Sequence, residues 1–209
     1  MKKPTVVLAD DHRLLLEAFR KLLEAEFDVV DCVSDGAQLV DAAARLSPDV
    51  VVTDVSMPRM GGIEAARRLR GLAPATRIVF LTVNEDPQLA AEAFRLGALG
   101  WVLKSSTATE LVVAVRSALR GRRYLTSLVC GGDVDALPLT AGPTAVEQLT
   151  PREREVLQLL AEGKAMKEVA AVLGISPRTV AFHKYRLMES LGIRTNAELV
   201  KFAVRSRVV

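Results

Sequence analysis

Short apolar runs alternate with longer amphipathic segments along the first 122 residues. Between the runs, apolar residues recur at helical spacing, for example at Leu14, Leu15, Ala18 and Leu22. The runs are rich in branched side chains and have the length of buried strands; they span residues 5–10, 27–33, 49–54, 77–82 and 100–104. Strands that alternate with helices in this way predict an α/β fold, a doubly wound sheet of five parallel strands.

The C-terminal 60 residues contain no strand-like run, and their helix boundaries are clear. The stretches "TPRE" at 150–153 and "TNAE" at 195–198 are capping boxes that start helices. The turn "LGIS" joins two further helices at the spacing of a helix-turn-helix. The sequence therefore predicts an all-α, four-helix domain with helices near residues 151–162, 165–172, 176–191 and 195–205.

A stretch rich in glycine and proline separates the two patterns; it includes Gly131, Gly132, Pro138, Gly142 and Pro143. Such a composition is typical of a connecting segment. The predicted organisation is a first domain at residues 1–122, a linker at 123–145 and a second domain at 146–209.

Composition excludes several classes of protein. Half of the 209 residues are hydrophobic, which is enough for buried cores. No apolar run approaches the ~20 residues of a membrane span, and the first residues lack the pattern of a signal peptide. We therefore expect a soluble cytoplasmic protein with no membrane partner. Cys32 and Cys130 are interpreted as reduced packing residues.

The net charge of +3 is distributed unevenly. Residues 146–209 carry 11 Lys and Arg against 7 Asp and Glu, so this segment alone has a surplus of four positive charges. A basic helical domain favours a nucleic-acid partner.

Three carboxylates follow predicted strands. Asp10 and Asp11 come after the first strand and Asp54 after the third. In a doubly wound sheet, functional groups gather beyond the carboxyl ends of the strands, at the point where the strand order reverses. Two carboxylates ~4 Å apart repel by about 4 kcal/mol at an effective dielectric of 20. A divalent cation is therefore implied, and all-oxygen ligands beside a phosphate favour Mg²⁺.

The remaining strand ends contribute Thr82 and Lys104. A metal, a carboxylate, a hydroxyl and an ammonium at one edge are suited to transfer of a phosphoryl group onto Asp54, the nucleophile. Taken singly, an aspartate at a strand end is more often a cap or turn residue. Five such groups at four strand ends favour the catalytic interpretation. His12, beside the acidic pair, is expected to be a surface residue of the first helical turn.

Several separated motifs carry a family resemblance. The stretches "LADDH" (8–12), "DVSMPRMGGIEA" (54–65), "LT" (81–82) and "GALGWVLK" (97–104) resemble the receiver domain of bacterial two-component response regulators, which has a flavodoxin-like fold. The stretches "LTPREREVLQLLAEG" and "KEVAAVLGISPRTVAFH" resemble the LuxR-type helix-turn-helix of the NarL/FixJ subfamily. The two patterns stand in the order that this family uses.

The resemblance implies roles for individual residues. Asp54 would accept a phosphoryl group from a histidine of a sensor kinase, and Mg²⁺ would be held by Asp10, Asp11, Asp54 and the carbonyl of Ser56. It also implies that Thr82 and the aromatic at position 101 act as a switch. That position is usually Tyr or Phe in the family, and here it is Trp101.

The predicted helix at 176–191 has two distinct faces. Val180, Leu187 and Leu191 form an apolar stripe for the core. Exposed aromatics on the opposite face indicate a contact surface, which comprises Arg178, Phe182, Tyr185 and Glu189, with Ala181 at its flank. In a helix-turn-helix this face enters the major groove of double-stranded DNA.

The resemblance points the same way. It places Ala181, Phe182 and Tyr185 toward the bases, and it places Lys167, Thr179, His183 and Lys184 nearer the DNA backbone. The subfamily commonly carries lysine where this chain has Ala181, so readout would depend more on thymine methyl groups. The alternative is that Phe182 and Tyr185 form a protein interface; the basic surplus favours DNA.

The last predicted helix is expected to expose apolar surface and to pair in a homodimer through Leu199, Val200, Phe202 and Ala203. The predicted function is a phosphorylation-dependent transcription regulator. Two alternatives remain: a regulator that binds DNA without phosphorylation, with the acidic edge as a structural metal site, and an aspartate-dependent phosphohydrolase. The first would show equal DNA affinity with and without phosphate, and the second would turn over an external phosphate monoester.

Overall fold

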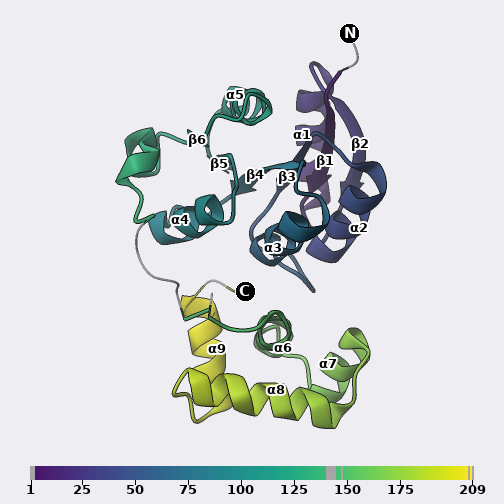
Figure 1. The fold of residues 1–209 in the computed structure, drawn as a ribbon, viewed down its shortest axis with the longest axis vertical. Helices are drawn as coiled ribbons and strands as arrows, with labels where there is room; N and C mark the ends of the chain where they lie inside the picture. Colours follow the sequence, from purple (N-terminus) through teal and green to yellow (C-terminus); the bar gives the residue numbers. More distant parts are fainter. Residues whose placement is uncertain (1–2, 140–144, 147, 207, 209) are drawn as a thin grey trace. The chain divides into compact units, whose positions relative to one another are not determined.

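In a computed structural model, which describes residues 3–139, 145–146, 148–206 and 208, the chain forms two compact units divided between Ala141 and Gly142. The first unit contains a parallel sheet, and its order is β2-β1-β3-β4-β5-β6 (Figure 1). Five of these strands are the predicted ones: β1 (Thr5–Ala9), β2 (Asp28–Val33), β3 (Val50–Thr53), β4 (Arg77–Thr82) and β5 (Gly100–Leu103). The strand order reverses at β1, so the carboxyl ends of β1 and β3 flank a topological switch point.

Five helices cover both faces of this sheet, because successive residues of a buried strand point to opposite sides. On one face, β1, β3, β4 and β5 pack against α1 (Arg13–Glu24) and α5 (Ala108–Leu119). On the other face they pack against α2 (Gly36–Leu46), α3 (Gly62–Leu72) and α4 (Pro87–Arg95). Figure 1 shows α5 and α4 on opposite sides of β4 and β5.

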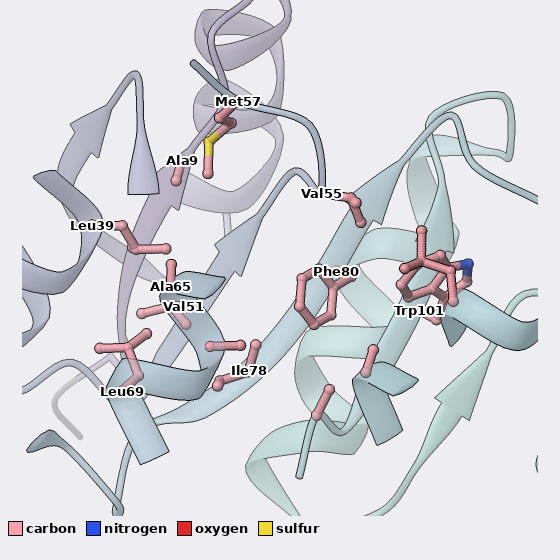
Figure 2. Packing of buried hydrophobic residues seen from close by; sticks show 14 of the residues in the cluster. Ala9, Leu39, Val51, Val55, Met57, Ala65, Leu69, Ile78, Phe80 and Trp101 are labelled. Atoms are coloured by element: carbon pink, nitrogen blue, oxygen red, sulfur yellow. The ribbon is translucent and has the colours of Figure 1, made fainter. Parts of the chain in front are cut away.

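The larger core lies on the side of α2, α3 and α4. Figure 2 shows part of it, in which strand residues meet helix residues, among them Ala9, Val51, Phe80, Leu39, Ala65 and Leu69. Trp101 is completely buried, and its ring centroid lies 5.5 Å from that of Phe80. The core therefore extends to the carboxyl end of the sheet, directly beneath the predicted site.

The sheet has one strand more than predicted. β6 (Tyr124–Leu125) pairs in parallel with β5 at the edge of the sheet. The Tyr124 amide donates to the Leu99 carbonyl at 2.8 Å, and the Thr126 amide donates to the Trp101 carbonyl at 2.9 Å. A strand of two residues is too short to show an alternation of apolar and polar positions in the sequence. The prediction of five strands was therefore wrong, because it missed β6.

The predicted linker at 123–145 differs from the structure over its first part. After β6 come two short 3-10 helices, η1 (Cys130–Gly132) and η2 (Val134–Ala136). Val129 and Leu137 are buried in the larger core, and the Arg95 guanidinium donates to the Pro138 carbonyl at 3.2 Å. Gly131 and Gly132, which had indicated coil, adopt positive φ angles in the turns of this packed segment. Residues 140–144, which include Gly142 and Pro143, lie outside the described part of the chain.

The second unit has the predicted helices at nearly the predicted positions: α6 (Pro151–Ala161), α7 (Met166–Leu173), α8 (Pro177–Ser190) and α9 (Asn196–Arg205). Both capping boxes are present, with Thr150 and Glu153 at α6 and Thr195 and Glu198 at α9. Gly174, in the left-handed conformation, ends α7 and makes the turn into α8. Within the described residues, no helix is long and apolar enough to cross a membrane.

The packing of residues 123–139 predicts a measurable contribution to stability. Leu137→Ala should lower the free energy of unfolding of the first domain by about 2–3 kcal/mol, because it removes a buried side chain from the core. Trp101 is the only tryptophan, so its fluorescence during urea unfolding reports on that domain. Leu128→Ala, at an exposed position of the same segment, is the matched control. Equal and negligible effects of the two variants would show that the segment does not belong to the core.

Candidate functional site

The predicted acids and lysine lie together at the carboxyl end of the sheet. Asp10 directly follows β1, Asp54 follows β3 and Lys104 follows β5. The backbone continues the strand pairing into the site: the Asp54 amide donates to the Ala9 carbonyl at 2.9 Å, and the Lys104 amide donates to the Thr82 carbonyl at 2.7 Å. The parallel register thus brings side chains from three distant parts of the sequence to one place.

Lys104 bridges the two buried carboxylates. Its Nζ lies 2.7 Å from Asp10 Oδ2 and 2.6 Å from Asp54 Oδ2, and all three side chains are buried. Burial by itself lowers the pKa of Lys104, but the bonds to Asp10 and Asp54 outweigh it and raise that pKa, so the ammonium remains charged. Burial raises the pKa of Asp54, and Asp10 adds to this effect, while Lys104 opposes both.

The Asp54 carboxylate is fixed from two sides. Oδ2 accepts from Lys104, and Oδ1 accepts from the Val55 amide at 2.6 Å. The Ser56 amide lies 3.4 Å from the same Oδ1. At the start of α3 a Cβ on Gly62 would lie 1.9 Å from the Asp54 carbonyl oxygen, so only glycine fits there. The loop after β3 therefore folds back closely over the acid.

Asp11 and His12 complete the cluster on its solvent side. His12 Nδ1 lies 2.9 Å from Asp11 Oδ1 and 3.2 Å from Asp10 Oδ1. One possible ligand atom each from Asp10, Asp11, His12 and Asp54 lies within 4.8 Å of the others. Three carboxylates out of four donors fit a small hard cation such as Mg²⁺. The role of the Ser56 carbonyl stays a prediction. His12 is 65% exposed, which confirms the expected surface residue, and its ring also contacts the two neighbouring acids.

Asn84 connects the two predicted switch residues, and no pattern in the sequence had indicated it. Thr82 is buried, and its Oγ1 accepts from the Asn84 amide at 3.2 Å. The Trp101 indole Nε1 donates to the Asn84 carbonyl at 3.3 Å. The backbone of one residue in the β4–α4 loop therefore contacts both side chains.

The second candidate site is the exposed face of α8. Val180 and Leu187 are completely buried, as the apolar stripe predicted. On the other side, Phe182 is 56% exposed and Tyr185 is 69% exposed. The Arg186 guanidinium lies 5.8 Å from the centroid of the Phe182 ring, and the His183 ring approaches Phe182 edge-on at 5.6 Å. Both side chains therefore flank the exposed Phe182 ring, and the sequence pattern had not indicated Arg186.

The other residues predicted to contact DNA are accessible to different degrees. Lys167 and Arg178 are exposed. The remaining four are partly exposed: Thr179, Ala181, His183 and Lys184. No predicted DNA contact is buried.

The predicted dimer face of α9 needs correction. Leu199 and Ala203 are buried in the core of the second unit, because their i, i+4 spacing places both on the side of α9 that packs against α6. Phe202 also packs partly against this core, whereas Val200 and Val204 are exposed. A separate hollow, at the turn between α8 and α9, is lined by Leu191, Gly192, Ile193, Glu198, Lys201 and Phe202.

Each of the two units matches the model of a known protein family. The family model described as response regulator receiver domain matches residues 6–116. The model described as bacterial regulatory proteins, luxR family, matches residues 147–203.

Individual relatives match nearly the whole chain. The transcriptional regulatory protein UhpA of Escherichia coli is 36% identical over 200 residues, which cover 94% of this chain and 96% of the relative. The uncharacterized transcriptional regulatory protein YxjL of Bacillus subtilis is 34% identical over 213 residues, 99% and 98% of the two chains. A solved structure of RcsB from Salmonella enterica serovar Typhimurium, bound to promoter P1flhDC with phosphomimetic BeF3-, has a TM-score of 0.63 and 30% identity and covers 96% of this chain and 98% of its own.

The raised pKa of Asp54 predicts an effect on stability. Because the folded-state pKa lies above the unfolded value, the folded protein binds more protons between the two values, and stability falls as pH rises through that window. At neutral pH, without divalent cations, Asp54→Asn should therefore unfold at a higher urea concentration than the wild type. The difference should shrink as the pH is lowered through the acid range. A variant that is less stable than the wild type at neutral pH would show that the bond from Lys104 outweighs burial.

Proposed function

The chain belongs to the bacterial response regulators that join a receiver domain to a LuxR-type DNA-binding domain, and on this basis we propose that Asp54 is the phosphoacceptor of a phosphorylation-dependent transcription regulator. A histidine of a sensor kinase supplies the phosphoryl group. The observation that carries the proposal is the buried Asp54 carboxylate, which Lys104 links to Asp10 at the switch point of the sheet.

The contacts of Asp54 are suited to nucleophilic attack. The Val55 amide and Lys104 orient the carboxylate, and burial keeps water from solvating it. When a phosphoryl group is transferred, the Asp54 oxygen forms the new P–O bond and the phosphohistidine nitrogen leaves. Lys104, already charged and close by, then stabilises the phosphoryl oxygens.

The acidic cluster is the proposed site for Mg²⁺, with Asp10, Asp11, Asp54 and the Ser56 carbonyl as ligands. When bound, the ion neutralises charge on the oxygens of the transferred group. Asp11, on the solvent side, gives the ion access to the cluster. The only chemistry proposed is phosphorylation of the chain's own Asp54 and its hydrolysis; the protein is not an enzyme for an external substrate.

Thr82, Asn84 and Trp101 are the proposed route from the site to the rest of the receiver. A phosphoryl group on Asp54 offers new acceptor oxygens to the Thr82 hydroxyl. If that hydroxyl turns toward them, its contact with the Asn84 amide changes, and with it the loop that receives the Trp101 indole. Because the indole is already buried, we propose that the switch acts through the loop and not through a large rotation of the ring.

The face of α8 is the proposed reading surface for promoter DNA. Ala181, Phe182 and Tyr185 face the bases, where the apolar groups fit thymine methyls, and Lys167 and Arg178 contact phosphates. Thr179, His183 and Lys184 lie nearer the DNA backbone. A solved structure that resembles this chain contains two RcsB dimers bound to two parallel DNAs, which supports the proposal.

For this chain we propose a homodimer through the exposed side of α9, at Val200 and Val204. The receiver domain extends beyond residue 122 to include the packed residues up to 139, and the DNA-binding domain occupies 146–209. A cytoplasmic location follows from contact with DNA.

Asp54→Asn should abolish incorporation of hydroxylamine-labile phosphate from an acyl phosphate donor with Mg²⁺, because the amide is not a nucleophile for this transfer. Labelling of the purified protein and its loss with hydroxylamine provide the measurement. Asp28→Asn, at an exposed aspartate of β2, should label like the wild type. Equal labelling of the Asp54 and Asp28 variants would refute the assignment of the phosphoacceptor.

Two substitutions should separate base contacts from phosphate contacts. Phe182→Ala should weaken binding to a selected operator by about 1–3 kcal/mol and leave binding to random DNA nearly unchanged. Lys167→Ala should weaken both alike and reduce the slope of log affinity against log salt by about 1. Fluorescence anisotropy at several salt concentrations measures both quantities. If Phe182→Ala changes dimerisation and not DNA affinity, the aromatic face is a protein interface instead.

A further inference from the structure

A fully buried carboxylate outside the phosphorylation site has an unusually complete set of partners. Asp35 caps the start of α2, and its Oδ1 accepts from the amides of Ala37 and Gln38, both at 2.9 Å. Its Oδ2 accepts from the Gln38 side chain at 2.7 Å and from the Arg59 guanidinium. An ordinary helix cap lies at the surface and needs no cation. Burial of an ionised carboxylate is costly unless it is paired, and Arg59 supplies the opposite charge while Ala37 and Gln38 supply the other hydrogen bonds.

Arg59 belongs to a different element, the loop that carries the chain from Asp54 to α3. Its φ is +66°, in the left-handed region that side chains other than those of glycine and asparagine rarely adopt. The ion pair to Asp35 therefore opposes the local preference of the backbone. The pair ties the β3–α3 loop to the start of α2, across 24 positions of sequence.

A second contact holds the same two segments together. The Gly36 amide donates to the Met60 carbonyl at 2.9 Å, and a Cβ on Gly36 would lie only 2.5 Å from that oxygen. The loop is closed at its own base as well, because the Gly62 amide donates to the Val55 carbonyl at 2.8 Å. Residues 55–61 are thus fixed at the base by Gly62 and at the tip by Asp35 and Gly36. Ser56 lies between these points.

We propose that Asp35 and Arg59 are positioning residues for phosphorylation of Asp54: their ion pair fixes the loop that presents the Ser56 carbonyl to the metal ion. This inference rests on the proposed function, which assigns that carbonyl to Mg²⁺. The pair acts on the geometry of the metal ligand and not on the nucleophile, which has its own contacts to Lys104 and Val55.

The test separates metal affinity from the rate of the chemical step. Arg59→Gly suits the left-handed backbone and removes the ion pair, so the fold should be retained. It should bind Mg²⁺ about tenfold more weakly, as partners of metal ligands do when removed. Labelling from an acyl phosphate should be slow at low Mg²⁺ and should return close to the wild-type rate at saturating Mg²⁺. Calorimetric titration with MgCl₂ measures the affinity independently of labelling.

Two further variants complete the comparison. Asp35→Asn keeps an oxygen for the helix cap and loses the charge, so it should weaken Mg²⁺ binding in the same direction. Arg45→Ala is the matched control, because Arg45, near the end of α2, forms an exposed 2.9 Å ion pair with Asp31 of β2. Its Mg²⁺ affinity should equal that of the wild type.

Unchanged Mg²⁺ affinity of Arg59→Gly would overturn the inference while leaving the proposed function intact. So would a loss of labelling that excess Mg²⁺ does not restore, because the ion pair would then act on something other than the metal ligand. If the wild-type protein bound no Mg²⁺ at all, the proposed metal site would fail, and the inference would fail with it.

Discussion

The arrangement of the receiver depends on the electrostatic balance at the carboxyl end of its sheet. Two buried carboxylates, Asp10 and Asp54, share a single ammonium group, that of Lys104. Each of these charges would be costly to bury alone. The parallel strands bring them within hydrogen-bond distance, and the attraction offsets part of the cost of burial. The remaining cost of burying these charges is offset by the hydrophobic cores, which also hold β1, β3 and β5 in register.

The side chains of the site carry more negative than positive charge. One ammonium faces two buried acids, and the half-exposed Asp11 adds a third. Burial is the main cause of the raised pKa of Asp54, and the charge of Asp10 adds to it while Lys104 opposes both. Under the proposed function, a divalent cation and a phosphoryl group would both change the charge at this point and so bias the conformation of the neighbouring loops. Asn84 lies where such a change would pass from Thr82 to Trp101.

Much of this could be predicted from the sequence, since it depends on local patterns. Branched apolar runs located five strands, and the residues that follow them, such as Asp54 and Lys104, had to meet at one edge. The starts of α6 and α9 could be predicted as well, because a capping box is a pattern of four consecutive residues. Contacts between side chains of distant segments could not be predicted from such local patterns. The ion pair of Asp35 and Arg59, and the place of Asn84, depend on how loops fold over one another.

The errors have physical causes too. On α9 the apolar residues Leu199 and Ala203 were assigned to a surface, but apolar composition does not tell which side of a helix meets its own core. Glycines at 131 and 132 indicated coil, although they occupy tight turns of a segment that packs against the domain. The Val129 and Leu137 side chains, not the glycines, decide where that segment lies.

The two-residue strand β6 has a consequence for the behaviour of the protein at high concentration. Without it, β5 would end the sheet with a row of unpaired amide and carbonyl groups, to which a strand of another molecule could add. β6 satisfies part of that row, and the chain then turns away into η1 and η2 instead of offering a long, flat new edge. A stretch whose composition resembles a flexible tether thus protects this side of the receiver against edge-to-edge aggregation.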